Sequence, residues 1–299
     1  MMAKIPYTKA FLSYPDQITL LKSRGLNFAD EGKALHLLEN IGYYRLSGYW
    51  YPLLADKQNH IFKPTAEFEA AFNLYKFDRE LRKLVITELE KIEVAVRSKM
   101  VHVLSMAYDP FWIEDTTLFN NPVKYNTIIT KVNEEFSRSD EEFIASFRAK
   151  YSNPLPPAFM TLGISSFGTL SLLYSNLKPG LEKREIAGYF GLPDTVFSSW
   201  LHSIVYIRNV CAHHARLWNR LMSIQPLFPR NPRKTWLHDT RIDNKRTYYL
   251  LSMVIYLLNT VNPKHTFKRK LENLFLKYPN VDKGAMGFPA HWEAEPLWQ

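Results

Sequence analysis

The segment 202–220 combines histidine, asparagine and arginine, residue types that support phosphodiester chemistry without a metal. Its polar residues are spaced alternately by four and three, so on a helix they share a band roughly 80° wide at about 100° per residue. Histidine exchanges a proton near neutral pH, and arginine holds a phosphate through two parallel hydrogen bonds. The spacing therefore predicts a polar line on one helix, made of His202, Tyr206, Asn209, His213, Arg216 and Arg220.

The rest of this helix, expected to begin after Pro193 and to continue to about Arg220, is mostly apolar and therefore largely buried. A buried polar group without a partner costs about 1–3 kcal/mol, so the line needs internal hydrogen bonds, a partner subunit or a ligand. Histidines and arginines beside an apolar core favour chemistry or anion binding over an internal network. A metal site is disfavoured because adjacent His213 and His214 diverge on a helix and Cys211 is the single cysteine. We expect no metal and no cofactor.

Helices are expected to position these residues. The chain has only 11 glycines, alternating strand patterns are nearly absent, and apolar residues recur at three-and-four spacing, which predicts an all-α fold. The clearest helix is predicted over 72–104, where charged residues surround an apolar face made of Phe77, Leu81, Leu84, Val85, Leu89, Ile92, Val96, Met100 and Val101.

Prolines divide the remaining chain into further helices. Pro110 is expected to close the first long helix, and three prolines between 154 and 157 precede a helix predicted over 158–177. A proline-rich connection then leads through a basic stretch to an apolar helix over 247–261 and a basic helix over 265–277.

The composition indicates a cytoplasmic globular protein with an anionic partner. A chain of 299 residues with 46% hydrophobic content can bury a large core, and its formal charge of +9 favours a partner such as nucleic acid. A single cysteine forms no internal disulfide, which fits a reducing compartment. The first residues lack an apolar stretch of signal-peptide length, and the most apolar run, 248–261, is too short to span a membrane.

Two other groups of residues have both a structural and a functional interpretation. Glu93 and Arg97, four residues apart on the predicted 72–104 helix, form either a structural ion pair, which we favour, or a support for the site. The aromatic cluster within 43–51 either stacks on unpaired bases or packs in the core, and core packing is favoured.

Basic residues interleaved with aromatic ones between 230 and 249 either grip an RNA backbone or form a solvated face. The same two interpretations apply to the basic trio at 268–270. The residues of the first group are Arg230, Arg233, Lys234, Trp236, Arg241, Lys245, Arg246, Tyr248 and Tyr249.

The run RNVCAH at 208–213 resembles the Arg, Asn, then His motif of HEPN proteins, an all-helical superfamily rich in metal-independent ribonucleases. More of the sequence resembles the Abi-like family of bacterial abortive-infection proteins, and the likeness covers nearly the whole chain. The segments that carry it are IGYYRLSGYWYPL at 41–53, FDRELRKL at 77–84, ELEKIEVAVRSK at 88–99, SSFGTLSLLYSNL at 165–177, RNVCAHHARLWNR at 208–220 and MGFPAHW at 286–292.

The resemblance implies one Abi-like helical domain over 1–299, with an N-terminal subregion at 1–70, a HEPN-like bundle core at 71–225 and basic C-terminal helices at 226–299. It also implies an antiphage toxin that acts on RNA as a homodimer, with a small RNA as an associated regulator.

The resemblance assigns roles by position. His213 would act as general base on the ribose 2′-hydroxyl, Arg208 would hold the scissile phosphate, and Asn209 would orient one or the other, leaving a cyclic phosphate. Five residues along an ideal helix place Arg208 roughly 140° from His213. Either a distorted helix or, as we favour, a twofold interface between two copies would bring these residues together. The supporting or RNA-binding residues would be His214, Arg216, Arg220, Tyr206, Glu93 and Arg97.

Two other functions compete with the ribonuclease. A HEPN protein that binds RNA without cutting it would use the same arginines and histidines as a phosphate clamp. In the segment 184–201, Ala187 and Gly191 have the spacing of helix-turn-helix DNA readers, which would make the chain a regulator. The proposed recognition helix would, however, continue into an apolar segment and leave few polar residues to read bases.

Overall fold

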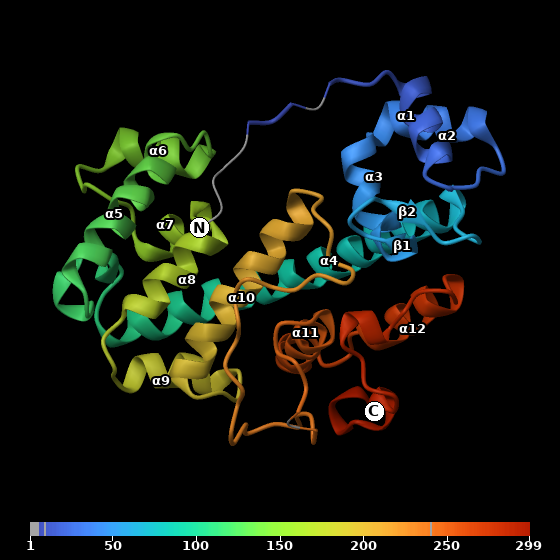
Figure 1. Cartoon of the computed structure of the whole chain (residues 1–299). Helices are drawn as coiled ribbons and strands as arrows, with labels where there is room; N and C mark the ends of the chain where they lie inside the picture. Colours follow the sequence, from blue (N-terminus) through green and yellow to red (C-terminus); the bar gives the residue numbers. More distant parts are fainter. Residues whose placement is uncertain (1–5, 9, 240) are drawn as a thin grey trace. The chain divides into compact units, whose positions relative to one another are not determined.

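The structure, a computed structural model, describes residues 6–8, 10–239 and 241–299, and it is predominantly helical (Figure 1). The predicted all-α fold is confirmed, because strands are confined in the described residues to a short antiparallel pair, β1 (Leu54–Asp56) and β2 (Ile61–Phe62). The α-helices of the described residues are α1 (Tyr14–Ser23), α2 (Glu31–Ile41), α3 (Tyr43–Trp50), α4 (Phe68–Ala107), α5 (Pro122–Ser137), α6 (Glu142–Lys150), α7 (Ala158–Ile164), α8 (Phe167–Asn176), α9 (Leu181–Tyr189), α10 (Asp194–Ala212), α11 (Thr247–Val261) and α12 (Phe267–Lys277).

The chain forms two compact units. The first comprises residues up to Glu80 together with 274–281, and the second comprises 81–273 together with 282–299. Within the first unit, Phe77 stacks on Phe275 with ring centroids 5.7 Å apart. Lys277 pairs there with Glu80 at 2.8 Å. Aromatic and charged contacts therefore join the α12 segment of this unit to the first part of α4.

The aromatic cluster at 43–51 is divided between the core of the first unit and its surface. Tyr49 and Trp50 are buried, and the Tyr49 hydroxyl donates a hydrogen bond of 2.6 Å to the buried carboxylate of Asp78. Tyr44 is different, because 92% of it is exposed. Tyr51 is also exposed, at 47%, so the core interpretation is confirmed for Tyr49 and Trp50 and wrong for Tyr44 and Tyr51.

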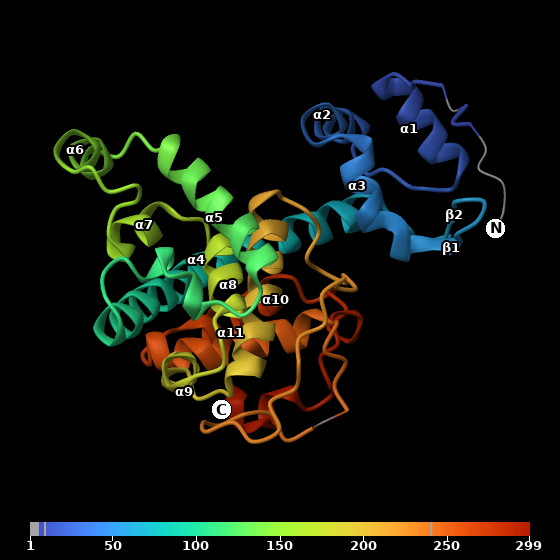
Figure 2. The same ribbon diagram turned by 90° about the vertical axis from the view of Figure 1, so that its left-hand side faces the viewer.

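The core of the second unit is built on the apolar faces of α4, α8, α10 and α11. The α4 side chains predicted for this core, from Leu81 to Met100, include residues with no exposed surface. In both views α8 lies between α5 and α10, and its contacts with these helices agree (Figures 1 and 2). Helix α11 begins at Thr247 and ends at Val261 as predicted, and it is buried on nearly every side because its sequence is apolar all round.

Two predicted helices end earlier than the apolar periodicity indicated. The helix expected over 158–177 is broken into α7 and α8, because the Ser166 hydroxyl caps a new helix by accepting a hydrogen bond of 3.2 Å from the Thr169 N–H. The helix expected to reach Arg220 stops at Ala212. Local capping geometry, rather than the apolar pattern, sets both boundaries.

No helix among the described residues is both long enough and apolar enough to cross a membrane.

Candidate functional site

The candidate motif lies where α10 ends. His213 is the first residue after the helix, and its N–H still donates a hydrogen bond of 2.9 Å to the Asn209 carbonyl. The next two N–H groups, of His214 and Ala215, donate to the carbonyls of Cys211 and Val210 at 3.1 and 2.9 Å. These crossed hydrogen bonds are the Schellman arrangement, which closes a helix at its C-terminus. They hold His213 one turn beyond Asn209.

His214 explains why the helix stops. Its φ is +56°, in the left-handed region that interrupts a right-handed helix and that usually holds glycine. Nothing in the apolar pattern marks this position, so the helix predicted to reach Arg220 was wrong. Arg216 and Arg220 therefore lie beyond the helix and do not belong to the polar line. The line consists of His202, Tyr206, Asn209 and His213.

The motif is exposed, although α10 is deeply packed on its other sides. Arg208, Asn209 and His213 are open to solvent, whereas Ile207 and Val210 are buried. The apolar sides of α10 are buried as expected, but His202, Asn209 and His213 of the polar line are exposed, so these side chains do not need an internal hydrogen-bond network. The three side chains are accessible to a large anionic ligand.

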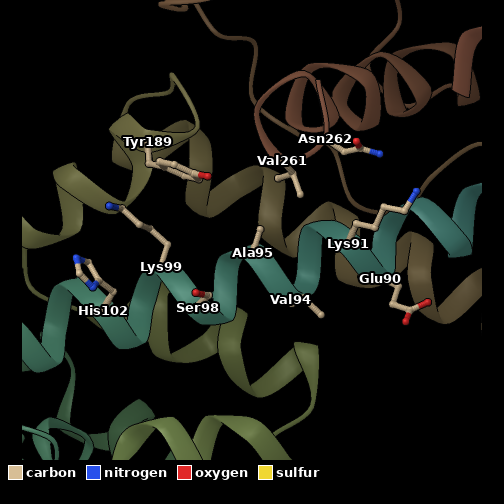
Figure 3. Close-up of a pocket in the computed structure, with 10 residues that line it drawn as sticks. All are labelled: Glu90, Lys91, Val94, Ala95, Ser98, Lys99, His102, Tyr189, Val261 and Asn262. Carbon is tan, nitrogen blue, oxygen red and sulfur yellow. The ribbon is translucent and has the colours of Figure 1, made fainter. Parts of the chain in front are cut away.

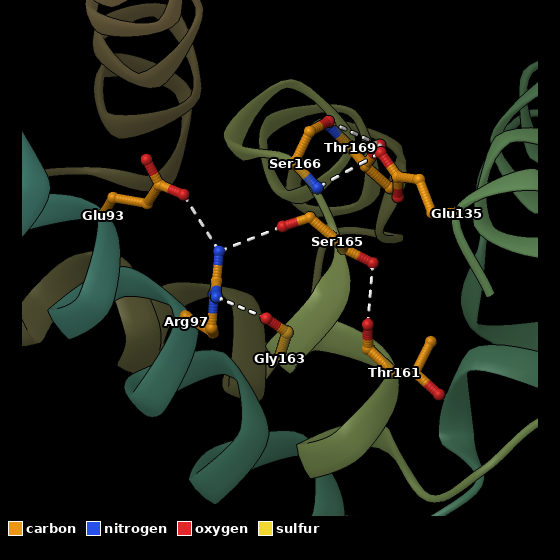
Figure 4. Close-up of polar contacts among 8 residues, drawn as sticks. All are labelled: Glu93, Arg97, Glu135, Thr161, Gly163, Ser165, Ser166 and Thr169. Atoms are coloured by element: carbon orange, nitrogen blue, oxygen red, sulfur yellow. Dashed lines mark hydrogen bonds and ion pairs between the residues drawn. The ribbon is translucent and has the colours of Figure 1, made fainter. Parts of the chain in front are cut away.

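Arg208 belongs to a charged cluster with two residues of α4. The Arg97 guanidinium donates a hydrogen bond of 2.9 Å to the Glu93 carboxylate, which confirms the predicted ion pair (Figure 4). Burial raises the pKa of Glu93 above its usual 4.5, while the charges of Arg97 and then Arg208 act in the opposite direction. The fold therefore brings Arg208 near Glu93.

Arg97 also anchors the connection between α7 and α8. Its guanidinium donates to the carbonyls of Gly163 and Ser165 at 2.9 and 3.0 Å, in addition to its bond with Glu93 (Figure 4). Because the Arg97 guanidinium bonds to three acceptors, it links α4 to the connection between α7 and α8. The structural interpretation of the pair is supported, whereas Arg208, Asn209 and His213 are exposed.

Arg220 and Tyr206 form a second polar group beyond the end of α10. The Arg220 Nε donates a hydrogen bond of 3.0 Å to the Tyr206 hydroxyl, and a guanidinium nitrogen donates to the Arg216 carbonyl at 3.2 Å. Burial raises the pKa of Tyr206, but hydrogen bonds from Ser223 and Arg220 outweigh this and hold the pKa below its ordinary value. Arg220 thus fastens the segment after the helix to α10.

Several residues of the basic stretch before α11 are buried or paired with neighbouring side chains. Tyr248 and Tyr249 are fully buried, so neither can stack on a base, and this part of the expectation was wrong. Arg241 pairs with Asp239 at 3.2 Å, and Lys234 donates to the Thr260 hydroxyl. Arg230 and Arg233 remain exposed at this stretch.

A groove of about 630 Å³ lies along α4, between Tyr189 and the end of α11 (Figure 3). The ammonium of Lys99 lies 5.1 Å from the centre of the Tyr189 ring and 3.6 Å from the Glu185 carboxylate. Lys91 pairs with Glu88 at 2.6 Å. The groove is thus lined by cations that have protein partners, and it is separate from the Arg208 cluster.

Sequence reasoning missed the partners that complete these clusters. Nothing in the sequence indicates that the backbone carbonyls of Gly163 and Ser165 accept hydrogen bonds from an arginine. Ser223 and Tyr206 are also not related by the spacing of one helix, so their hydrogen bond could not be predicted from periodicity. The two serines that begin the SSFGTL segment were the available clue to a chain break beside α4. Among the described residues, no three or more histidine, cysteine or acidic side chains are placed to hold a metal ion.

Comparison with protein families identifies a match over more than half of the chain. Residues 36–219 match the model of the family described as Abi-like protein. The matched range includes Glu93, Arg97 and the whole of α10 with its cap. No curated protein and no solved structure matches the chain.

Proposed function

Because the chain belongs to the Abi-like protein family, which suggests abortive-infection defence, we propose that it is an antiphage toxin that cleaves RNA without a metal. The proposal also assigns the chain to the HEPN superfamily, because the RNVCAH motif at 208–213 resembles the motif of that superfamily. One observation carries it: Arg208, Asn209 and His213 are exposed at the hydrogen-bonded end of a helix whose other sides are buried, so the backbone that carries them is held while a long anion can reach their side chains.

The proposed chemistry is an internal transfer at phosphorus. The His213 imidazole takes the proton of a ribose 2′-hydroxyl, whose oxygen forms a bond to the adjacent phosphorus. The bond from phosphorus to the 5′-oxygen breaks, and that oxygen takes a proton from solvent as the second RNA fragment leaves, while the His213 imidazolium returns its proton to solvent. The products are a 2′,3′-cyclic phosphate and a 5′-hydroxyl, and no oxidant, reductant or co-reactant is consumed.

Arg208 and Asn209 would assist this step in different ways. The Arg208 guanidinium stabilises the negative charge that builds on the phosphate oxygens, and Asn209 orients the hydroxyl or the phosphate by hydrogen bonding. Asn209 lies one turn before His213, so these two side chains share a face. Arg208 lies near Glu93, which places it towards another side of α10.

The active unit in this proposal is a homodimer. A twofold interface across the end of α10 would place Arg208 of one copy beside His213 of the other, and it would join the two separated parts of the site. The protein would act in the cytoplasm, and its substrate would be RNA, with a small RNA as a regulatory partner.

The alternative with the most support is an RNA clamp that cleaves nothing. Exposed Arg208 and His213 would bind phosphates equally well in such a protein. The helix-turn-helix alternative has less support, because Val196, Phe197 and Trp200 in the first turns of α10 are buried. A recognition helix needs those turns exposed to reach base edges.

Co-purification separates these functions. The chain is expressed with its flanking DNA as wild type, as His213→Ala and as His202→Ala, a matched change at another exposed histidine of α10. The ribonuclease predicts bound RNA with cyclic-phosphate ends that disappear only in His213→Ala, while RNA affinity is retained. A discrete RNA with the same ends in all three proteins supports the clamp, and absence of RNA contradicts both.

A further inference from the structure

An acid-lined hollow of about 1050 Å³ lies at the junction of α5, α6 and α7. Three successive exposed carboxylates, Asp140, Glu141 and Glu142, line it where the chain passes from α5 into α6. Among the described residues that line it, Arg138 is the one cation, in a protein whose formal net charge is +9. The local charge is thus opposite to that of the whole chain.

A buried carboxylate forms part of the wall of this hollow. Glu135 is only 8% exposed, and one of its oxygens accepts hydrogen bonds of 3.1 Å from the Ser166 N–H and 3.0 Å from the Thr169 hydroxyl (Figure 4). The second oxygen, Oε2, is buried and has no hydrogen-bond partner among the described residues. A buried carboxylate oxygen without a donor is costly, and a cation in the hollow would relieve that cost.

The lining favours an organic cation. In the described part of the chain these carboxylates do not gather into a group that could hold a metal ion. Phe143, 40% exposed, adds an aromatic surface to the carboxylates. Ammonium and guanidinium groups bind both aromatic faces and carboxylates. Pockets for drug-sized ligands have volumes of roughly 300–1,000 Å³, so this hollow can hold a polyamine or one or two basic side chains of a peptide.

We propose that the hollow between α5, α6 and α7 binds a ligand carrying ammonium or guanidinium groups, supplied by a lysine- or arginine-rich peptide segment or by a free polyamine. Asp140, Glu141 and Glu142 attract the cation at the mouth, and Glu135 receives it at the wall. The site is independent of RNA cleavage, because none of these residues belongs to the Arg208 cluster.

Calorimetric titration of the full chain tests this site with tetralysine peptide and, separately, with spermidine. The variant Glu135→Gln keeps a carbonyl oxygen for Ser166 and Thr169 while removing the charge, so it should fold and bind at least about tenfold more weakly. The combined change Asp140→Asn, Glu141→Gln and Glu142→Gln should weaken binding similarly. Arg138→Gln removes the opposing cation and should tighten it.

The control for the triple variant removes three negative charges elsewhere, by Glu39→Gln, Glu114→Gln and Glu293→Gln. These three residues are exposed and lie outside the hollow. Unchanged binding in this control supports a specific site. Tighter binding of tetralysine than of spermidine would assign the natural ligand to a protein segment, and the reverse would assign it to polyamines. Equal affinity of the wild type, Glu135→Gln and the control for both probes, or no binding of either, would overturn the proposal.

Discussion

Replacing Arg97 by methionine distinguishes a structural role of this residue from a catalytic one. The change keeps an apolar stem of similar length but removes three hydrogen bonds, to Glu93, Gly163 and Ser165. A bond that involves a charged group contributes about 1.5–3 kcal/mol, and the side chains of Arg97 and Glu93 are 23% and 18% exposed. With a discount for this partial exposure and for non-additivity, we expect a loss of about 2–4 kcal/mol in unfolding free energy.

The matched change is Glu93→Gln, which removes the ion pair but leaves both carbonyl bonds of Arg97 in place. It should cost no more than about 1 kcal/mol near neutral pH, because a partly exposed pair contributes little by itself. Lys124→Met on α5, at an exposed cation, should change stability by less than about 0.5 kcal/mol.

Urea unfolding followed by circular dichroism measures these differences, and hydrogen exchange at amides 158–176 locates them. Faster exchange is expected at the α7–α8 connection in Arg97→Met. A loss below about 1 kcal/mol for Arg97→Met, or a loss equal to that of Glu93→Gln, would show that the carbonyl bonds do not anchor this connection.

Two further predictions concern the cap of α10 and the charge of Glu93. Because His214 has a φ of +56°, His214→Gly should be more stable than His214→Ala by about 1 kcal/mol in denaturant unfolding, and a more stable alanine variant would contradict the strained cap. The pKa of Glu93 is raised above 4.5 chiefly by burial, so the folded state binds this proton more tightly than the unfolded state does. The stability that this proton contributes is present below about pH 4.5 and is lost as the pH rises through the folded pKa. The unfolding free energy of wild type minus that of Glu93→Gln should therefore decrease between about pH 4 and about pH 7, and a constant or rising difference would refute the assigned direction.

The parts of the fold that depend on apolar periodicity could be predicted from the sequence. Helix α11 was predicted with its observed ends, and α4 was found although it extends a few residues beyond the predicted range at each end. Periodicity reports which faces are buried, but it does not report where one backbone residue adopts another conformation. The break at Ser166 and the left-handed conformation of His214 are such positions, and both lie inside continuous apolar patterns.

The candidate site shows the same division between local and tertiary information. The Glu93–Arg97 pair follows from a spacing of four on one helix and was predicted. Arg208 lies near Glu93, but the two residues belong to helices far apart in the sequence. A spacing rule that applies within one helix therefore cannot predict this contact. The exposure of the motif also depends on tertiary packing. The sequence shows that apolar residues flank the polar line along α10, but it does not show which faces of α10 other elements cover.

The end of α10 bears directly on how Arg208 and His213 would act together. Helix distortion was one way to bring them together, but the backbone is helical up to Ala212, and the N–H of His213 still bonds to the Asn209 carbonyl before the left-handed His214. The cap therefore leaves the angular separation of Arg208 and His213 nearly that of an ideal helix, roughly 140°. Within one chain, phosphate binding at Arg208 and proton transfer at His213 would face different sides. Since the cap does not remove this separation, we propose that a second copy across the exposed end of α10 brings its Arg208 to His213.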